Sequence, residues 1–226
     1  EFLQKYGIVI VYKKNLERYG GKIMNGYFSL VLHAHLPYVR HPEYEEFLEE
    51  DWLYEAITET YIPLLEMFEN LTRDNIPWNI TITMSGTLVN MLNDGLLRER
   101  YLRHMNKLVE FCENEVERLS PYPDMLNVAK HNLWFNTRAR QVFEEKYNKD
   151  LVGAFRKFQD QGNLEIIPVT ATHGFLPVMK DYPEAVNAQV LMAKKDYIKN
   201  FGRDPKGIWL AECAYYPGQD KFLEKH

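Results

Sequence analysis

Residues 207–218 read GIWLAECAYYPG, and this stretch decides the fold. Its apolar run, residues 207–211, follows the turn signal DPK and has the length of a buried strand. One carboxylate, Glu212, stands where the run ends. A parallel α/β barrel carries its chemistry at the carboxyl ends of its strands, so Glu212 is a candidate catalytic residue. A carboxylate after a single strand can equally be a helix cap or half of a surface ion pair.

Two earlier apolar runs end in the same way. Residues 27–32 lead into His33 and His35, and residues 164–169 lead into His173. The carboxyl ends of parallel strands meet at one edge of a sheet, so we expect these side chains to form a site with Glu212. Strands that alternate with helices predict a parallel sheet and an α/β fold.

The composition is that of a soluble globular domain with a sizeable core. The chain has 226 residues, of which 46% are hydrophobic and 26% charged. Its formal net charge of −5 argues against nucleic acid as a partner and offers no basic face for a membrane. Aromatic residues make up 14% of the chain. They suit a core, and they would also suit sugars, whose apolar faces stack on flat rings.

The cysteines favour a reducing compartment. Cys112 and Cys213 are far apart and have no metal-type spacing. Because the sequence shows neither a signal-peptide pattern nor an apolar run of membrane length, we expect a cytoplasmic protein. Strand alternation would point Cys213 away from Glu212, which predicts a small buried residue and not a nucleophile.

The chain has two regions that depart from a simple strand-helix repeat. Residues 1–23 fit poorly with the rest of the chain, so we expect an upstream extension outside the fold, with a strand at residues 7–12 as the alternative. Residues 24–226 then form the catalytic fold. Within them, about 94–161 reads as three helices in succession, which exceeds a normal crossover and predicts a helical insertion. Four predicted strands do not close a barrel, so the chain looks like a fragment.

The remaining elements are predicted from local signals. Residues 51–70 carry a helical stripe that Pro63 should kink or break. Residues 78–83 alternate like a strand, after which Ser85 can cap a short helix. A further helix should begin near Pro183 and end before Gly202.

Glu212 suits glycoside chemistry. A retaining glycosidase needs a nucleophilic carboxylate and a second carboxyl group about 5–5.5 Å away as acid/base. Glu212 is a good candidate for the nucleophile. No second acid has equal standing, because Asp181 reads as a helix cap, Glu165 lies inside a strand and Asp204 lies in a turn.

The histidines leave three interpretations open. His33 and His35 alternate on an extended segment, so both imidazoles can face one metal ion, with His173 and Glu212 as further ligands. That pattern would suit a metal-dependent barrel hydrolase. Neutral histidines that hydrogen-bond a polar ligand, or histidines buried for packing, explain the same residues.

Three motifs together carry a family resemblance. HAHLPYVRHPE (33–43), GNLEIIPVTATHGFLP (162–177) and GIWLAECAYYPG (207–218) resemble, in order and spacing, the first three motifs of glycoside hydrolase family 57. The resemblance runs from about Met24 to the last residue. It is closest to the group of 1,4-α-glucan branching enzymes and intracellular α-amylases.

The resemblance implies an incomplete TIM-like (β/α)7 barrel, of which this chain is the N-terminal part, with a helical insertion. Glu212 matches the catalytic nucleophile, and neither a cofactor nor a metal is implied. Trp52 resembles an aromatic residue that binds glucan. Tyr215 could belong to the same platform or could pack beneath the insertion. The residues that match the family's sugar-binding histidines are His33, His35 and His173.

The implied function is that of a retaining enzyme on α-1,4-glucans such as amylose, glycogen and maltooligosaccharides. Branching, as in glycogen biosynthesis, is the expected reaction, with α-amylase or 4-α-glucanotransferase activity as alternatives. The family's acid/base aspartate lies in a fourth motif that this sequence lacks, so we expect the chain alone to be inactive. A glucan-binding fragment without activity is the non-enzymatic alternative. The oligomeric state stays open.

Overall fold

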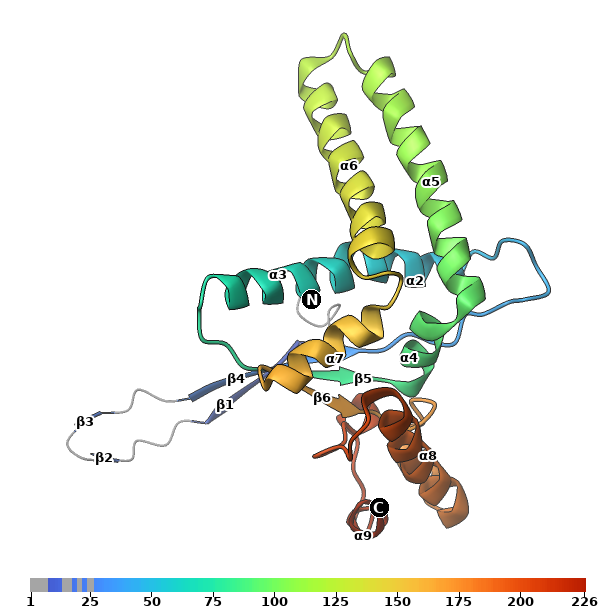
Figure 1. The fold of residues 1–226 in the computed structure, drawn as a ribbon. Coiled ribbons are helices and arrows are strands. Elements are labelled where there is room, and N and C mark those ends of the chain that lie inside the picture. Colours follow the sequence, from blue (N-terminus) through green and yellow to red (C-terminus); the bar gives the residue numbers. More distant parts are fainter. Residues whose placement is uncertain (1–7, 14–17, 20–21, 24–26) are drawn as a thin grey trace. The chain divides into compact units, whose positions relative to one another are not determined.

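A computed structural model describes residues 8–13, 18–19, 22–23 and 27–226 (Figure 1). The chain divides into two compact units. The first comprises the described residues up to His35 together with Trp78–Leu88 and Phe158–His226. The second comprises Leu36–Pro77 and Val89–Lys157.

The first unit is built on a four-stranded sheet with the order β1-β4-β5-β6. The last three strands are parallel, as predicted, whereas β1 pairs antiparallel with β4. Ile82 and Ile166 are buried on one face of this sheet, in register with each other. Its strands are β1 (Ile8–Lys13), β4 (Tyr27–Ala34), β5 (Ile80–Met84) and β6 (Leu164–Pro168), and a separate pair consists of β2 (Arg18–Tyr19) and β3 (Lys22–Ile23).

The N-terminal region is described only in part. Ile8–Lys13 forms β1, which corresponds to the strand that the sequence offered as the alternative at residues 7–12. Residues 1–7, 14–17, 20–21 and 24–26 lie outside the described residues. Whether residues 1–23 belong to the catalytic fold therefore stays a prediction.

The strand predicted at residues 207–211 is wrong in its length. Only Trp209 pairs, in a single parallel bridge with Val169, and its N–H donates to the carbonyl of Pro168 (2.9 Å). A 3₁₀ turn, Ala211–Cys213, comes directly after it. Glu212 and Cys213 have positive φ angles of 55° and 56°, which turn the chain away from the extended direction.

The helices of the first unit end where the sequence predicts. Gly202 stops α8 in the left-handed conformation (φ 71°), and Gly162 (φ 86°) follows α7. Leu176, Val186 and Val190 form a small buried core in this part of the unit. These elements are α7 (Leu151–Gln161), which begins in the second unit, the 3₁₀ helix Leu176–Met179, α8 (Pro183–Phe201) and α9 (Asp220–Lys225).

The second unit is helical. Asp94 caps α5 by accepting the N–H of Leu97 (3.0 Å), and α5 packs beside α6 (Figure 1). Tyr101 and Phe143 meet edge to face in its core, with ring centroids 4.6 Å apart. The unit contains α2 (Glu50–Ala56), α3 (Ile62–Arg73), α5 (Gly95–Arg118) and α6 (Pro123–Gln141), while α4 (Gly86–Asn93) connects it to the first unit.

Pro63 lies in the first turn of α3 and marks an interruption of the α-helix predicted over residues 51–70. A π-helical segment, Ile57–Tyr61, joins α2 to α3 immediately before it. Proline has no N–H for the carbonyl four residues earlier, and the wider π turn absorbs that loss locally. A second π segment, Val142–Lys146, ends α6. None of the helices in the described part of the chain is long and apolar enough to cross a membrane.

Candidate active site

The structure brings the three predicted histidines together at the carboxyl ends of β4 and β6. His33 is the penultimate residue of β4, His35 follows that strand, and His173 lies in the loop after β6. Nε2 of His33 is 3.2 Å from Nε2 of His173. The rings of His35 and His173 stack, with centroids 3.6 Å apart. These residues form one cluster within the first unit.

Two hydroxyl groups contact the Nδ1 atoms of His33 and His35. Neither of them was predicted from the sequence to belong to the site. Thr83 pairs in register with His33, and its Oγ1 is 2.6 Å from Nδ1 of that ring. Oγ of Ser85 is 2.9 Å from Nδ1 of His35. Both hydroxyl residues are fully buried. Ser85 also caps α4 as predicted, because it accepts the N–H of Leu88 (3.3 Å).

Glu212 lies beside the cluster on a left-handed turn. Its Oε1 is 4.0 Å from Nδ1 of His173, and its side chain is 71% exposed. Six non-glycine residues of the described chain have positive φ, and three of them are His173, Glu212 and Cys213. Such backbone conformations cost about 1–3 kcal/mol each and concentrate at functional sites.

The same turn corrects the prediction for Cys213. The sequence predicts a buried residue, but Cys213 is exposed and free. Strand alternation does not apply here, since both Glu212 and Cys213 are left-handed and no strand continues through them.

Burial keeps the histidines neutral. It lowers the pKa of His33 to about 4, with the neighbouring His173 as the second cause and Glu212 as an opposing one. It also lowers the pKa of His35 to about 4, again with help from His173. The pKa of His173 is lowered by burial too, although the Glu212 carboxylate opposes this shift. The cluster is therefore uncharged at neutral pH.

The loop of His173 is held by its own backbone and by the turn after β5. The N–H of His173 donates to the carbonyl of Thr170 (2.8 Å), and the buried Thr170 hydroxyl donates to the carbonyl of Gly174 (3.1 Å). A Cβ on Gly86 would lie 3.1 Å from the carbonyl oxygen of Ala171. This close approach favours glycine at position 86, because a larger residue would need the loop to shift by a few tenths of an ångström.

Three aromatic residues are candidates for sugar contacts. Trp209, which the sequence did not single out, lies against His33 with ring centroids 5.6 Å apart. Tyr215 is 56% exposed, and its hydroxyl donates to Asp220 (3.1 Å). Trp52 lies in α2 of the second unit and is 49% exposed. Sugar contacts by Trp52 and Tyr215 stay predictions.

The cluster is poorly shaped for a metal ion. The described residues contain no group of three or more His, Cys, Asp or Glu side chains arranged to hold one. The rings of His35 and His173 are only 11° from parallel, so their in-plane lone pairs cannot converge on a common ion. The geometry thus gives the metal-dependent hydrolase alternative no support.

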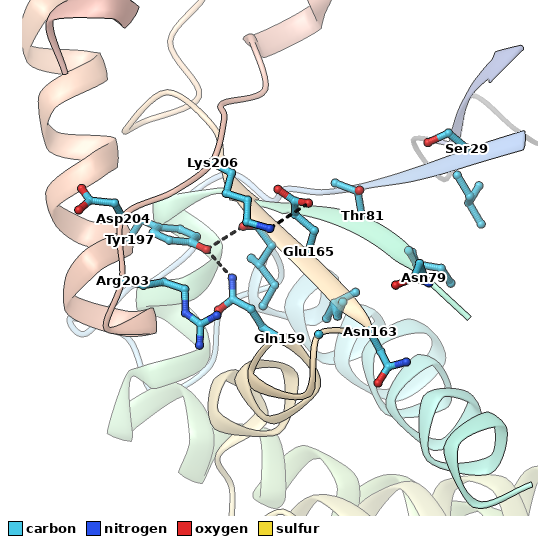
Figure 2. A pocket seen from close by; sticks show the side chains of 15 residues that line it. Ser29, Asn79, Thr81, Gln159, Asn163, Glu165, Tyr197, Arg203, Asp204 and Lys206 are labelled. Carbon is cyan, nitrogen blue, oxygen red and sulfur yellow. Dashed lines mark hydrogen bonds and ion pairs between the residues drawn. The ribbon is translucent and has the colours of Figure 1, made fainter. Parts of the chain in front are cut away.

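A polar pocket of about 320 Å³ lies nearer the amino ends of the same strands (Figure 2). Thr81 and Glu165 line it, and they lie two residues before Thr83 and Ile167 on the strands that carry the site. Tyr197 closes one side, where it accepts a hydrogen bond from Gln159 and donates to the carbonyl of Ile166. Chemistry in parallel α/β folds occurs at the carboxyl ends of strands, so the histidine cluster is the stronger candidate.

Comparison with known proteins identifies the family. Residues 29–226 match the model of Glycosyl hydrolase family 57. The chain is 39% identical over 219 residues to a 1,4-alpha-glucan branching enzyme of Thermococcus kodakarensis, an alignment that covers 89% of this chain and 31% of that protein.

Solved structures show the same likeness. The alpha-amylase AmyC from Thermotoga maritima is 46% identical with a TM-score of 0.82, over 86% of this chain and 37% of that one. A GH57-type branching enzyme from Pyrococcus horikoshii is 35% identical with a TM-score of 0.77, over 83% of this chain and 34% of that one. The chain thus spans about a third of the length of these relatives. Since the matched residues include Glu212 and all three clustered histidines, the chain belongs to glycosyl hydrolase family 57.

Proposed function

We propose that this chain carries the nucleophile and part of the sugar site of a retaining enzyme that acts on α-1,4-glucans. The observation that carries the proposal is the position of Glu212. An accessible carboxylate stands on a strained turn, 4.0 Å from an uncharged histidine, at the carboxyl end of a parallel sheet. Relatives named as a 1,4-alpha-glucan branching enzyme and an alpha-amylase support the substrate class.

The reaction is a double displacement. A Glu212 oxygen forms a bond to the anomeric carbon while the bond from that carbon to the glycosidic oxygen breaks. The leaving oxygen takes a proton from a second carboxyl group. The resulting glucosyl ester is then attacked by a hydroxyl group, either of water or of another glucan, which returns its proton to the same carboxyl group.

The histidines position the sugar. Nδ1 of His35 is engaged by Ser85, so a sugar hydroxyl can reach that ring at Nε2. Both nitrogens of His33 already have protein partners, Thr83 and His173, so that ring shapes the site and orients its neighbour. Uncharged imidazoles give hydrogen bonds without placing a cation beside the positive charge that develops at the anomeric carbon. The histidines contribute to the reaction by orienting the anomeric carbon toward Glu212.

The sheet suggests where the second carboxyl group belongs. We propose that β4, β5 and β6 are the first parallel strands of a TIM-like (β/α)7 barrel and that the acid/base aspartate belongs to a later strand end of that barrel. On this proposal the helices around residues 94–161 are an insertion. The chain alone then lacks the acid/base group and should not turn over amylose, because loss of one member of a catalytic pair costs orders of magnitude in rate.

Branching is our first choice for the fate of the glucosyl group, and hydrolysis is the second candidate. The 39% identity to a named branching enzyme supports the first, and the 46% identity to a named alpha-amylase supports the second. The choice depends on whether an acceptor glucan is held over the intermediate better than water. Exposed aromatic rings such as Trp52 and Tyr215 would serve as part of that acceptor platform.

We further propose that the reaction needs no cofactor and takes place in the cytoplasm as part of glycogen synthesis. The chemistry of a carboxylate pair requires neither a metal ion nor a redox group. Both cysteines are free, in keeping with a reducing compartment.

Amylose distinguishes the candidate reactions. For any length of the protein that is active, branching predicts new α-1,6 signals by NMR and reducing ends that rise only after a debranching enzyme is added. Hydrolysis predicts reducing ends that rise without debranching and no α-1,6 signal. Turnover of amylose by the 226-residue chain itself, lost in Glu212→Gln, would contradict the expectation that the second carboxyl group is missing.

A further inference from the structure

The hydroxyl group of Thr83 begins a line of polar contacts that ends on Glu212. Oγ1 of Thr83 is 2.6 Å from Nδ1 of His33, and Nε2 of His33 is 3.2 Å from Nε2 of His173. Nδ1 of His173 lies 4.0 Å from Oε1 of Glu212. A neutral imidazole has one N–H and one lone pair, so the proton positions along this line depend on one another.

The Thr83 end selects one direction for these hydrogen bonds. Its side chain is fully buried, and within the described part of the chain its hydroxyl has a single partner, Nδ1 of His33. If Nδ1 donated, the hydroxyl hydrogen would have no acceptor among those residues, and a buried donor without an acceptor is costly. Thr83 therefore donates to Nδ1, and His33 carries its own proton on Nε2.

The Glu212 end is consistent with the same direction. With the His33 proton on Nε2, Nε2 of His173 must accept it, so His173 carries its proton on Nδ1. That N–H faces the Glu212 carboxylate. The opposite arrangement would place a nitrogen lone pair against a negative charge. The two ends of the line thus agree on a single pair of tautomers.

We infer that Thr83 is a positioning residue that sets the tautomers of His33 and His173 and thereby holds the Glu212 carboxylate for attack. Its role toward Glu212 rests on the proposed function, whereas the tautomers themselves do not. The separation of 4.0 Å between His173 and Glu212 becomes a hydrogen bond after a movement of about 1 Å, because such bonds have lengths of 2.7–3.2 Å.

Nitrogen NMR reads the tautomers directly. In the chain labelled with ¹⁵N-histidine, long-range proton–nitrogen spectra should show His33 protonated on Nε2 and His173 protonated on Nδ1. Thr83→Val keeps a similar shape without the hydroxyl and should abolish this preference, while Thr83→Ser should retain it. Thr81→Val is the matched control, since it removes a hydroxyl from the same strand two residues earlier.

A second measurement tests how fast the Glu212 carboxylate reacts with a sugar donor. The donor 5-fluoro-α-glucosyl fluoride needs no acid catalyst, because fluoride leaves unprotonated as the carboxylate bonds to the anomeric carbon. Mass spectrometry measures the rate at which this donor becomes covalently attached to Glu212. We expect that rate to fall about tenfold or more in Thr83→Val. Thr83→Ser and Thr81→Val should stay close to the wild-type rate.

The outcomes separate this inference from the proposed function. A wild-type chain with the His33 proton on Nδ1, or a Thr83→Val variant that is labelled at the wild-type rate, would overturn the inference. A wild-type chain that has both expected tautomers but is not labelled on Glu212 would contradict the proposed function. The wild-type spectrum decides on the tautomers even if Thr83→Val does not fold.

Discussion

The imidazole rings of His35 and His173 stack face to face, with centroids 3.6 Å apart and planes 11° from parallel. Two positive charges at this distance would repel strongly, and burial adds the cost of desolvating each charge. The stack therefore requires at least one neutral ring, and the lowered pKa values of the cluster keep all its members neutral at pH 7.

Acid should destabilise the chain through these histidines. Their folded-state pKa, about 4 for His33 and for His35, lies below the unfolded value of 6.5, so the unfolded chain binds protons first as the pH falls. Their contribution to stability is complete above pH 6.5, declines as the pH falls from 6.5 to 4, and changes no further below 4. Urea denaturation across this range should show the decline.

A histidine variant tests the source of that decline. His35→Gln should flatten the pH dependence between 6.5 and 4, because one of the two strongly shifted groups is gone. His131→Gln removes an exposed histidine of α6 and serves as the control. Equal slopes for wild type and His35→Gln would show that the cluster does not govern acid stability.

The left-handed turn at Glu212 predicts opposite effects for two neighbouring substitutions. Cys213→Gly should raise the free energy of unfolding by about 1 kcal/mol, because Cys213 has φ 56° and glycine adopts that conformation without strain. Ala214→Gly should lower it by roughly 0.5–1 kcal/mol, because Ala214 has an ordinary φ of −92°. Denaturant melts of both variants measure the direction of each change in the free energy of unfolding. A loss of stability in Cys213→Gly would contradict the claim that the backbone at Cys213 is strained.

A methyl group on Gly86 should disturb the site without unfolding the chain. Its Cβ would lie 3.1 Å from the carbonyl oxygen of Ala171, so the loop that carries His173 must shift by a few tenths of an ångström. We expect Gly86→Ala to slow the labelling of Glu212 by the fluoride donor severalfold while the melting temperature changes little. Gly95→Ala, where a Cβ meets nothing within 4 Å, is the control. Equal labelling rates would mean that the loop tolerates the shift.

Local signals predicted most of the fold. Apolar runs located β4 and β6, alternation located β5, and the glycine at 202 marked the end of α8. Alternation along the extended segment placed His33 and His35 on the same side, where both contact His173. These features could be predicted because strand polarity and side-chain alternation are local properties of the chain.

The remaining features depend on contacts between distant residues. Thr83 joins the site because β5 pairs with β4 in one register, and no sequence pattern sets that register by itself. The positive φ angles at Glu212 and Cys213 occur in residues that usually avoid them, so only surrounding structure can impose them. That turn also cuts short the strand predicted at residues 207–211. The hydroxyls of Thr83 and Ser85 lie at the carboxyl end of β5, so the strand-end pattern, applied to β5, could have found them.

Whether Glu212 is the nucleophile is tested most directly by trapping a glucosyl ester. The chain is incubated with 5-fluoro-α-glucosyl fluoride, digested at low pH and mapped by mass spectrometry, with Glu212→Gln and the exposed Glu224→Gln as matched variants. We predict one added 5-fluoroglucosyl group on the peptide that contains Glu212, which persists in Glu224→Gln and is absent from Glu212→Gln. A label on any other carboxylate, or a label that survives in Glu212→Gln, would contradict the assignment of Glu212 as the nucleophile.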